Sequence, residues 1–300
     1  MKINRKVFLR LFVLSLALSA GLQVNIAATY FDVKGGDTNG DGIVKVLAIG
    51  NSFSDDAVEH HLYGLARAGG KTVIIGNLYI GGAPLEKHYN NASSDAKAYS
   101  YRKIDTNGVK VVTKNTSISQ ALVDEDWDYI SFQQVSSLSG KLETFKEHLP
   151  FVFNYVKERA KNPDVKYLLH QTWAYEQSST HKGFANYDND QMKMYEAIVS
   201  TYAKVKDMID ADAIVPAGTA IQNARTSSIG DHFTRDGYHL DLNYGRYTAS
   251  GAWYEIIFGE SVIGNSYRPD AMSEKEVKIA QKAAHAAVKK PKKVTKLKRL

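Results

Sequence analysis

The sequence predicts an α/β fold in which a doubly wound, mostly parallel sheet is covered by helices on both faces. Short apolar, β-branched runs alternate along the chain with longer segments whose apolar residues recur at helical spacing, and this alternation is typical of parallel sheets. Of the 300 residues, 44% are hydrophobic and 23% are charged, which suffices for one large core. We therefore expect a three-layer α/β/α domain.

Five apolar runs are expected to form the parallel strands, at residues 44–49, 71–78, 128–132, 165–169 and 213–215. A helical pattern follows the first run and is opened by the acidic pair Asp55-Asp56. Apolar residues at helical spacing predict further helices at residues 145–160, 190–209 and 242–258.

One insertion, residues 86–127, breaks this alternation between the second and third strands. Residues 99–105 and 109–114 flank Asn107-Gly108, a strong hairpin signal. A short helix capped by Thr116 or Ser117 is expected to follow. Because an excursion from the carboxyl end of a strand borders the crevice of a doubly wound sheet, the insertion either shapes substrate access or only decorates the sheet edge.

The two ends of the chain differ in composition from its middle. Residues 1–28 combine four basic residues, a short apolar stretch and Ala27-Ala28, the pattern of a cleaved signal peptide, which predicts a secreted or periplasmic protein. A Gly/Asp-rich lead-in (29–43), the main domain (44–270) and a C-terminal helix with a basic tail (271–300) are expected to follow.

The formal net charge of +6 comes from these ends. Four basic residues lie in 1–28 and seven in 289–300, so the part between them carries −5. We therefore expect no nucleic-acid partner, and a solvated, disordered tail rather than one that binds anionic surfaces. The chain has no cysteine, and no apolar run after residue 28 approaches the ~20 residues of a membrane span.

The lead-in contains a possible ion site. Asp37, Asn39 and Asp41 match the opening of a calcium loop, but Ala48 occupies the closing position. We expect a Gly/Asp turn that binds a weak ion at most. No His, Asp and Glu cluster shows zinc spacing, so neither a metal nor an organic cofactor is expected.

The residue that organises the chemistry is Ser52, which follows the first strand and a glycine. A serine on a strand-to-helix turn stands clear of the sheet edge, beside helix N–H groups that stabilise negative charge. The alternative is that Ser52 and Ser54 are only helix caps. The sequence around Ser52 lacks the G-x-S-x-G pattern of an α/β-hydrolase elbow.

A base is available at the other end of the domain. Asp236 and His239 lie three residues apart before the last helix of the main domain. Histidine is the commonest general base, and a nearby carboxylate holds its tautomer. His232, in the same loop, is a rival base.

These motifs resemble those of the SGNH (GDSL-type) hydrolases. The segment GNSFS at 50–54 is similar to the family's opening block, DGYH at 236–239 to its closing block, and Gly81 or Gly82 to its second block. The resemblance spans about residues 44–258 and implies a flavodoxin-like sandwich, Ser52 as nucleophile, His239 as base and Asp236 as its orienting acid.

The resemblance also implies an oxyanion hole built from the backbone N–H groups of Ser52 and Gly82 and one side-chain donor. The family's third block supplies that donor from an asparagine, whereas this chain has QQVSS at 133–137. Either Gln133 or Ser136 is expected to replace it. A missing donor typically costs about 2.7–4 kcal/mol of transition-state stabilisation.

Two functions remain open. The first is a secreted serine esterase that hydrolyses carboxylic esters, above all O-acetyl groups, on a small-molecule or polysaccharide substrate, with Trp173 stacking on a sugar ring. Tyr175 is expected to pack inside, and His170 to face the crevice. The second is a non-catalytic carbohydrate-binding protein on the same fold.

Overall fold

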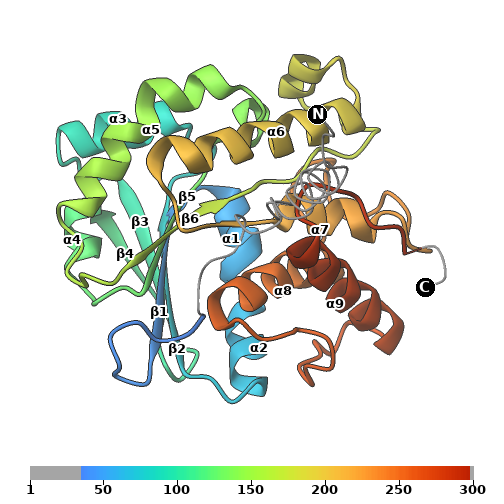
Figure 1. The fold of residues 1–300 in the computed structure, drawn as a ribbon, viewed down its shortest axis with the longest axis horizontal. Coiled ribbons are helices and arrows are strands. Elements are labelled where there is room, and N and C mark those ends of the chain that lie inside the picture. The colour runs from blue at the N-terminus through green and yellow to red at the C-terminus, as the bar shows by residue number, and fades with distance from the viewer. Residues whose placement is uncertain (1–34, 298–300) are drawn as a thin grey trace, which may run out of the picture. The chain divides into compact units, whose positions relative to one another are not determined.

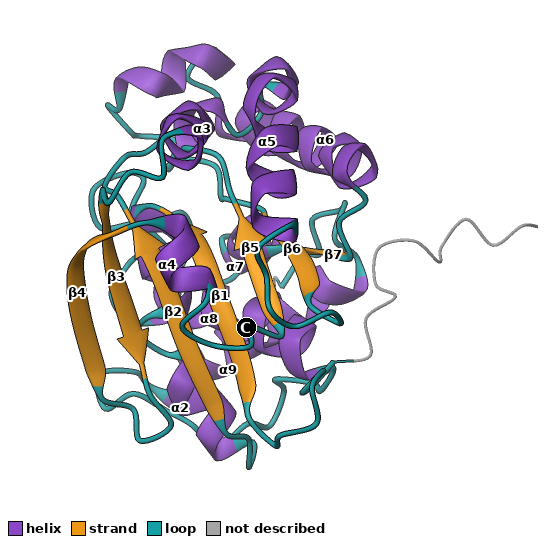
Figure 2. Ribbon diagram, turned by 90° about the vertical axis from the view of Figure 1, so that its left-hand side faces the viewer, coloured by secondary structure: helices purple, strands orange, loops and turns teal. Residues whose placement is uncertain are grey.

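The computed structural model describes residues 35–297, so the predicted signal peptide lies outside the described residues. Seven strands form one sheet in the order β4-β3-β2-β1-β5-β6-β7 (Figure 2). Their bounds are β1 Val44–Gly50, β2 Val73–Tyr79, β3 Tyr99–Ile104, β4 Lys110–Thr116, β5 Tyr129–Phe132, β6 Lys166–His170 and β7 Ala213–Val215.

The core of the sheet is parallel. β1 pairs with β2 and β5, β5 with β6, and β6 with β7, all in parallel. All seven residues of β1 are buried, because helices cover the sheet on both faces, and this explains its nearly continuous apolar sequence. The five predicted parallel strands are confirmed.

Helices form the two outer layers (Figures 1 and 2). On one face, helices that contact one another are α1 Ser52–Val58, α2 Leu62–Ala68, α7 Ala217–Ala224, α8 Tyr244–Phe258 and α9 Glu274–Lys289. On the other face they are α3 Leu85–Ser93, α4 Ile118–Leu122, α5 Leu142–Lys157 and α6 Gln191–Ile209. The predicted three-layer α/β/α sandwich is confirmed. Among residues 35–297, no helix is both long and apolar enough to cross a membrane.

The insertion extends the sheet at its β2 edge. β3 pairs antiparallel with β2 and with β4, as predicted for a hairpin. In its turn, Gly108 has a φ of +80°, which favours glycine, and the Asp105 carboxylate accepts from the N–H groups of Asn107 and Val109. Ser117 caps α4, since its hydroxyl accepts from the Gln120 N–H.

The C-terminal segment differs from expectation. α9 packs against α7 and α8 within the same helical layer. Beyond it, the Thr295 N–H donates to Asn223 Oδ1 (2.6 Å) and the Leu297 N–H to Thr226 Oγ1 (2.8 Å). The prediction of a solvated, disordered tail is therefore wrong for residues 290–297, because Asn223 of α7 and Thr226, just after that helix, bind its backbone.

Candidate active site

The turn from β1 into α1 presents Ser52 at the carboxyl edge of the sheet. Asn51 is the N-cap of α1, and its Oδ1 accepts from the Phe53 N–H at 3.0 Å. The Ser54 hydroxyl is buried and bonds to Asn51 O and Asn77 Oδ1. The capping role thus belongs to Asn51, and Ser52 is left to face the solvent-accessible side of the turn.

His239 lies between Ser52 and Asp236. Its Nε2 is 2.9 Å from Ser52 Oγ, and its Nδ1 is 2.6 Å from Asp236 Oδ2. Because an ionised carboxylate only accepts, Nδ1 carries the proton and Nε2 is free to accept from the Ser52 hydroxyl. The structure brings these three predicted residues together in the order that nucleophilic catalysis needs.

Asp236 is held by its own loop. Its Oδ1 accepts from the backbone N–H groups of His239 (2.8 Å) and Tyr238 (3.2 Å). Partial burial opposes ionisation, but the hydrogen bonds from His239 and Tyr238 outweigh it and lower the pKa of Asp236. The carboxylate is therefore charged and able to stabilise an imidazolium on His239.

A pocket of about 270 Å³ opens in front of these residues. Gly82, with a φ of +64°, contributes to its wall, and its N–H meets no acceptor among residues 35–297. The lining residues are Asn51, Ser52, Phe53, Tyr79, Gly81, Gly82, Val135, Ser136, His181, Tyr238 and His239. The predicted residues Ser52, Gly82, Ser136 and His239 thus share one cavity.

Gln133 does not line this pocket. Its Nε2 donates to Asn51 Oδ1 (2.7 Å) and its Oε1 accepts from His170 Nδ1 (3.0 Å). His170 is fully buried, which lowers its pKa to about 3, so the expectation that it faces the crevice is wrong. His170 thus holds Gln133, and Gln133 holds Asn51, whose Nδ2 in turn donates to Ala83 O, beside Gly82.

Ser136 is the better placed of the two predicted side-chain donors. It lines the pocket, and its hydroxyl lies 2.8 Å from the hydroxyl of Tyr175. Tyr175 is buried, as expected. When the Tyr175 O–H donates to Ser136 Oγ, the Ser136 hydrogen stays available for a ligand in the pocket.

The structure corrects the predicted role of Trp173. Its side chain is fully buried, so the prediction that it stacks on a substrate is wrong. It stacks on Phe53 with ring centroids 4.2 Å apart, and its Nε1 donates to Tyr238 O at 2.7 Å. Trp173 therefore supports the first turn of α1 and the Asp236–His239 loop from beneath.

Besides Phe53 and the predicted His239, three rings line the pocket that the sequence analysis did not select: Tyr79, Tyr238 and His181. His181 Nδ1 accepts from the Gly183 N–H at 3.0 Å, so a neutral ring carries its proton on Nε2. Tyr238 lies inside the Asp-x-x-His motif and Tyr79 directly follows the predicted strand at 71–78, so both positions carried a signal. His181 lies in a loop with no such pattern.

The hairpin insertion contacts the wall of the pocket at Tyr79. None of residues 99–127 lines the cavity. From β3, the Arg102 guanidinium lies 3.6 Å from the centroid of the Tyr79 ring and pairs with Asp55 of α1 and with Glu59, the residue that follows that helix. The insertion therefore does not line the pocket, but it holds the Tyr79 ring that forms part of the pocket wall.

The lead-in turn satisfies its own acidic groups. The Asp37 carboxylate accepts from the backbone N–H groups of Asn39, Gly40 and Gly42, and Asp41 pairs with Lys45. Within residues 35–297, no group of three or more His, Asp or Glu side chains is arranged to hold a metal ion.

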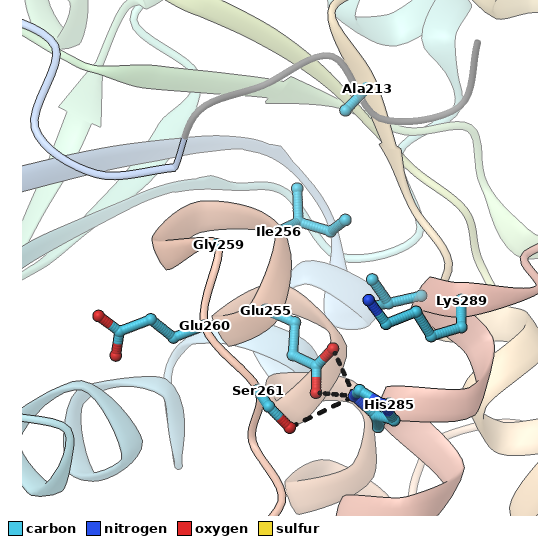
Figure 3. A pocket seen from close by; sticks show the side chains of 9 residues that line it. Ala213, Glu255, Ile256, Gly259, Glu260, Ser261, His285 and Lys289 are labelled. Carbon is cyan, nitrogen blue, oxygen red and sulfur yellow. Dashed lines mark hydrogen bonds and ion pairs between the residues drawn. The ribbon is translucent and has the colours of Figure 1, made fainter. Parts of the chain in front are cut away.

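A second cavity, of about 310 Å³, holds another serine, histidine and acid (Figure 3). His285 Nδ1 lies 3.0 Å from Glu255 Oε1 and 3.3 Å from Ser261 Oγ. Both partners thus meet the same ring nitrogen, so no proton path runs from the serine through the ring to the acid. Glu255 also accepts a hydrogen bond from the Val262 N–H, which fixes the turn after α8.

Comparison with known proteins assigns the family. Residues 45–287 match a domain of unknown function, DUF4886. The chain belongs to this family. A crystal structure of a DUF4886 family protein from Bacteroides uniformis is 50% identical, with a TM-score of 0.84 over 85% of this chain and 98% of that one.

More distant structures are also similar. One is a putative SGNH hydrolase from Slackia heliotrinireducens, at 20% identity and a TM-score of 0.49 over 72% of this chain and 99% of that one. Another is an acetylxylan esterase from Geobacillus stearothermophilus, at 11% identity and a TM-score of 0.47 over 79% of this chain and 100% of that one. Among curated proteins, none matches the chain.

Proposed function

We propose that this protein is a secreted serine esterase of the SGNH type that removes acyl groups, above all acetyl, from carbohydrate. The observation that carries the proposal is the unbroken path from Ser52 Oγ through His239 to Asp236, at the wall of an open pocket. Nucleophile, base and orienting acid in hydrogen-bond contact are the signature of acyl transfer through a covalent intermediate.

The reaction follows from these contacts. Ser52 Oγ attacks the ester carbonyl carbon while His239 Nε2 takes its proton, and Asp236 stabilises the imidazolium. Collapse of the tetrahedral intermediate breaks the bond to the alcohol, which receives the proton from His239. A water molecule, deprotonated by His239, then attacks the acyl-enzyme, releasing the carboxylic acid and restoring Ser52.

The developing oxyanion needs donors that are already in place. We assign the backbone N–H groups of Ser52 and Gly82 and the hydroxyl of Ser136 to this role. Ser136 is preferred over Gln133 because it lines the pocket, whereas both ends of the Gln133 amide are engaged by Asn51 and His170.

The shape of the pocket supports a small acyl group on a ring-shaped alcohol. A cavity of about 270 Å³ is at the low end for ligand sites. Tyr79 and Tyr238 offer aromatic faces on which the apolar face of a sugar ring stacks. The sequence resemblance to a family that often deacetylates sugars points the same way, and the signal-peptide pattern supports secretion.

The experiment that tests the proposal is hydrolysis of p-nitrophenyl acetate by the chain from residue 29 onward, beside Ser52→Ala. The proposal predicts turnover by the parent and none by the variant, followed by acetate release from acetylated polysaccharide. Equal activity in both proteins excludes Ser52 as nucleophile. If neither this ester nor acetylated polysaccharide is hydrolysed, esterase activity is excluded, and glycan binding becomes the function to measure.

A further inference from the structure

One buried acid next to the site has no role in the chemistry described above. Asp56 lies on α1, one helical turn after Ser52, and is fully buried. Its carboxylate accepts from Arg235 Nη1 on both oxygens (3.1 and 3.2 Å), from Arg246 Nε (2.8 Å) and from the Leu240 N–H (2.8 Å). We refer to these four groups as the Asp56 cluster.

The donors of the Asp56 cluster enclose the Asp236–His239 loop. Arg235 directly precedes this loop and Leu240 directly follows it, while Arg246 comes from α8. Arg235 also donates to the Leu240 carbonyl, and the Arg235 N–H bonds to His239 O at 2.9 Å. Both ends of the loop are thus tied to one carboxylate on the helix that begins with Ser52.

We propose that Asp56 is a positioning residue that sets the distance between Ser52 and His239; this inference rests on the proposed function. Ser52 and Asp56 lie one turn apart on the same helix, so their separation is fixed by helix geometry. Asp56 fixes the loop in turn through charge-assisted bonds, which are short and directional. The nucleophile and its base, distant in sequence, are thereby placed relative to each other through a single side chain.

The negative charge and both oxygens are needed for this role. A buried carboxylate is stable only when paired and hydrogen-bonded, and here the backbone and two arginines provide both. An asparagine has the same shape but one acceptor oxygen. Its NH₂ group would face donors that the second carboxylate oxygen of Asp56 now accepts from, so those hydrogen bonds would be lost. Asp56→Asn is therefore expected to loosen the loop while keeping the volume filled.

The test compares Asp56→Asn with Glu255→Gln on p-nitrophenyl acetate. Glu255 is a matched control, since it is also a buried acid bonded to a backbone N–H and a basic side chain, but in the distant cavity of Figure 3. Because misplacement by 1 Å can cost 100-fold, we expect kcat to fall by about 100-fold in Asp56→Asn, with KM within about twofold. Glu255→Gln is expected to keep both parameters.

Amide hydrogen exchange gives a second readout that does not depend on turnover. In Asp56→Asn, exchange of residues 234–241 is expected to rise, whereas β1 and β5 stay protected; Glu255→Gln is expected to leave 234–241 unchanged. If Asp56→Asn does not fold, Arg235→Gln replaces it in both measurements. This variant removes one donor from the partly exposed edge of the Asp56 cluster. It is expected to show the same pattern with a smaller loss of kcat.

The two proposals fail in different ways. Inactivity of the parent overturns the esterase proposal, and the exchange comparison then decides whether Asp56 holds the loop. A parent that is active through Ser52, with kcat and loop exchange unchanged in Asp56→Asn, overturns the positioning role. A rise in KM without a fall in kcat also overturns it, because misplacing the base slows chemistry rather than binding.

Discussion

Two cavities lined by residues 35–297 each hold a serine and a histidine with an acid beside it, and one of these two groups has the connectivity of a catalytic triad. In the first, His239 uses one ring nitrogen for Ser52 and the other for Asp236. In the second, His285 meets Ser261 and Glu255 through the same Nδ1. The comparison teaches that residue types in proximity do not define a site; what matters is whether the imidazole connects the hydroxyl to the acid.

The most direct way to break this comparison is to remove each histidine. His239→Ala is expected to lower kcat by about 10⁴-fold or more, because the base is lost. His285→Ala is expected to leave kcat unchanged and to lower the free energy of unfolding by about 1–3 kcal/mol, because buried Glu255 loses a partner. Steady-state kinetics and urea unfolding check both. An equal loss of activity in the two variants would contradict the assignment.

A second test removes only the negative charge of the orienting acid. Asp236→Asn no longer stabilises the imidazolium and favours the wrong tautomer, so kcat is expected to fall by up to about 10⁴-fold. Glu255→Gln serves as its control. A loss of less than threefold in Asp236→Asn speaks against the role of Asp236.

Asp236 also predicts a pH dependence of stability. Its folded-state pKa is lowered from the ordinary value of 3.8, so its contribution is fully present above that value and is lost as pH falls through the lower, folded-state pKa. The difference in thermal midpoint between the parent and Asp236→Asn is therefore expected to shrink below about pH 4. A difference that grows toward acid pH contradicts the sign.

Variants of the proposed oxyanion donor Ser136 and of its partner Tyr175 test the Ser52 site further. Ser136→Ala is expected to lower kcat by about 10²–10³-fold with little change in KM. Tyr175→Phe, which removes only the hydroxyl behind Ser136, is expected to have a smaller effect. In the double variant, Tyr175→Phe is expected to cause no further loss of kcat beyond that of Ser136→Ala, because Tyr175 acts through Ser136. Additive losses in the double variant point to separate roles.

The smallest effect is expected at the second serine. Ser261→Ala is expected to change kcat by less than about twofold, since its hydroxyl has no free ring nitrogen to receive the proton. Labelling with a fluorophosphonate, followed by peptide mass analysis, checks the same point. Modification is expected on Ser52 alone, and modification of Ser261 overturns the distinction between the two groups.

Local sequence patterns were informative where the chemistry is local. The apolar runs identified the parallel strands because both faces of this sheet are covered, and Asn107-Gly108 identified the hairpin because its turn needs positive φ. The Asp-x-x-His spacing placed Asp236 and His239 in one turn. These features depend on residues within a few positions of each other, so a single sequence encodes them directly.

Only the tertiary structure decided the direction of side chains whose partners lie far away in the sequence. Gln133 and Ser136 follow the same strand, yet Asn51 and His170 hold one inside while the other reaches the pocket. Trp173 is buried because Phe53 stacks on it. The basic tail lies against the C-terminal end of α7 because Asn223 on that helix and Thr226 just after it accept its backbone N–H groups. The sequence by itself determined the layers and the residue types of the Ser52–His239–Asp236 group, whereas packing between elements far apart in the chain decided which polar groups face the pocket.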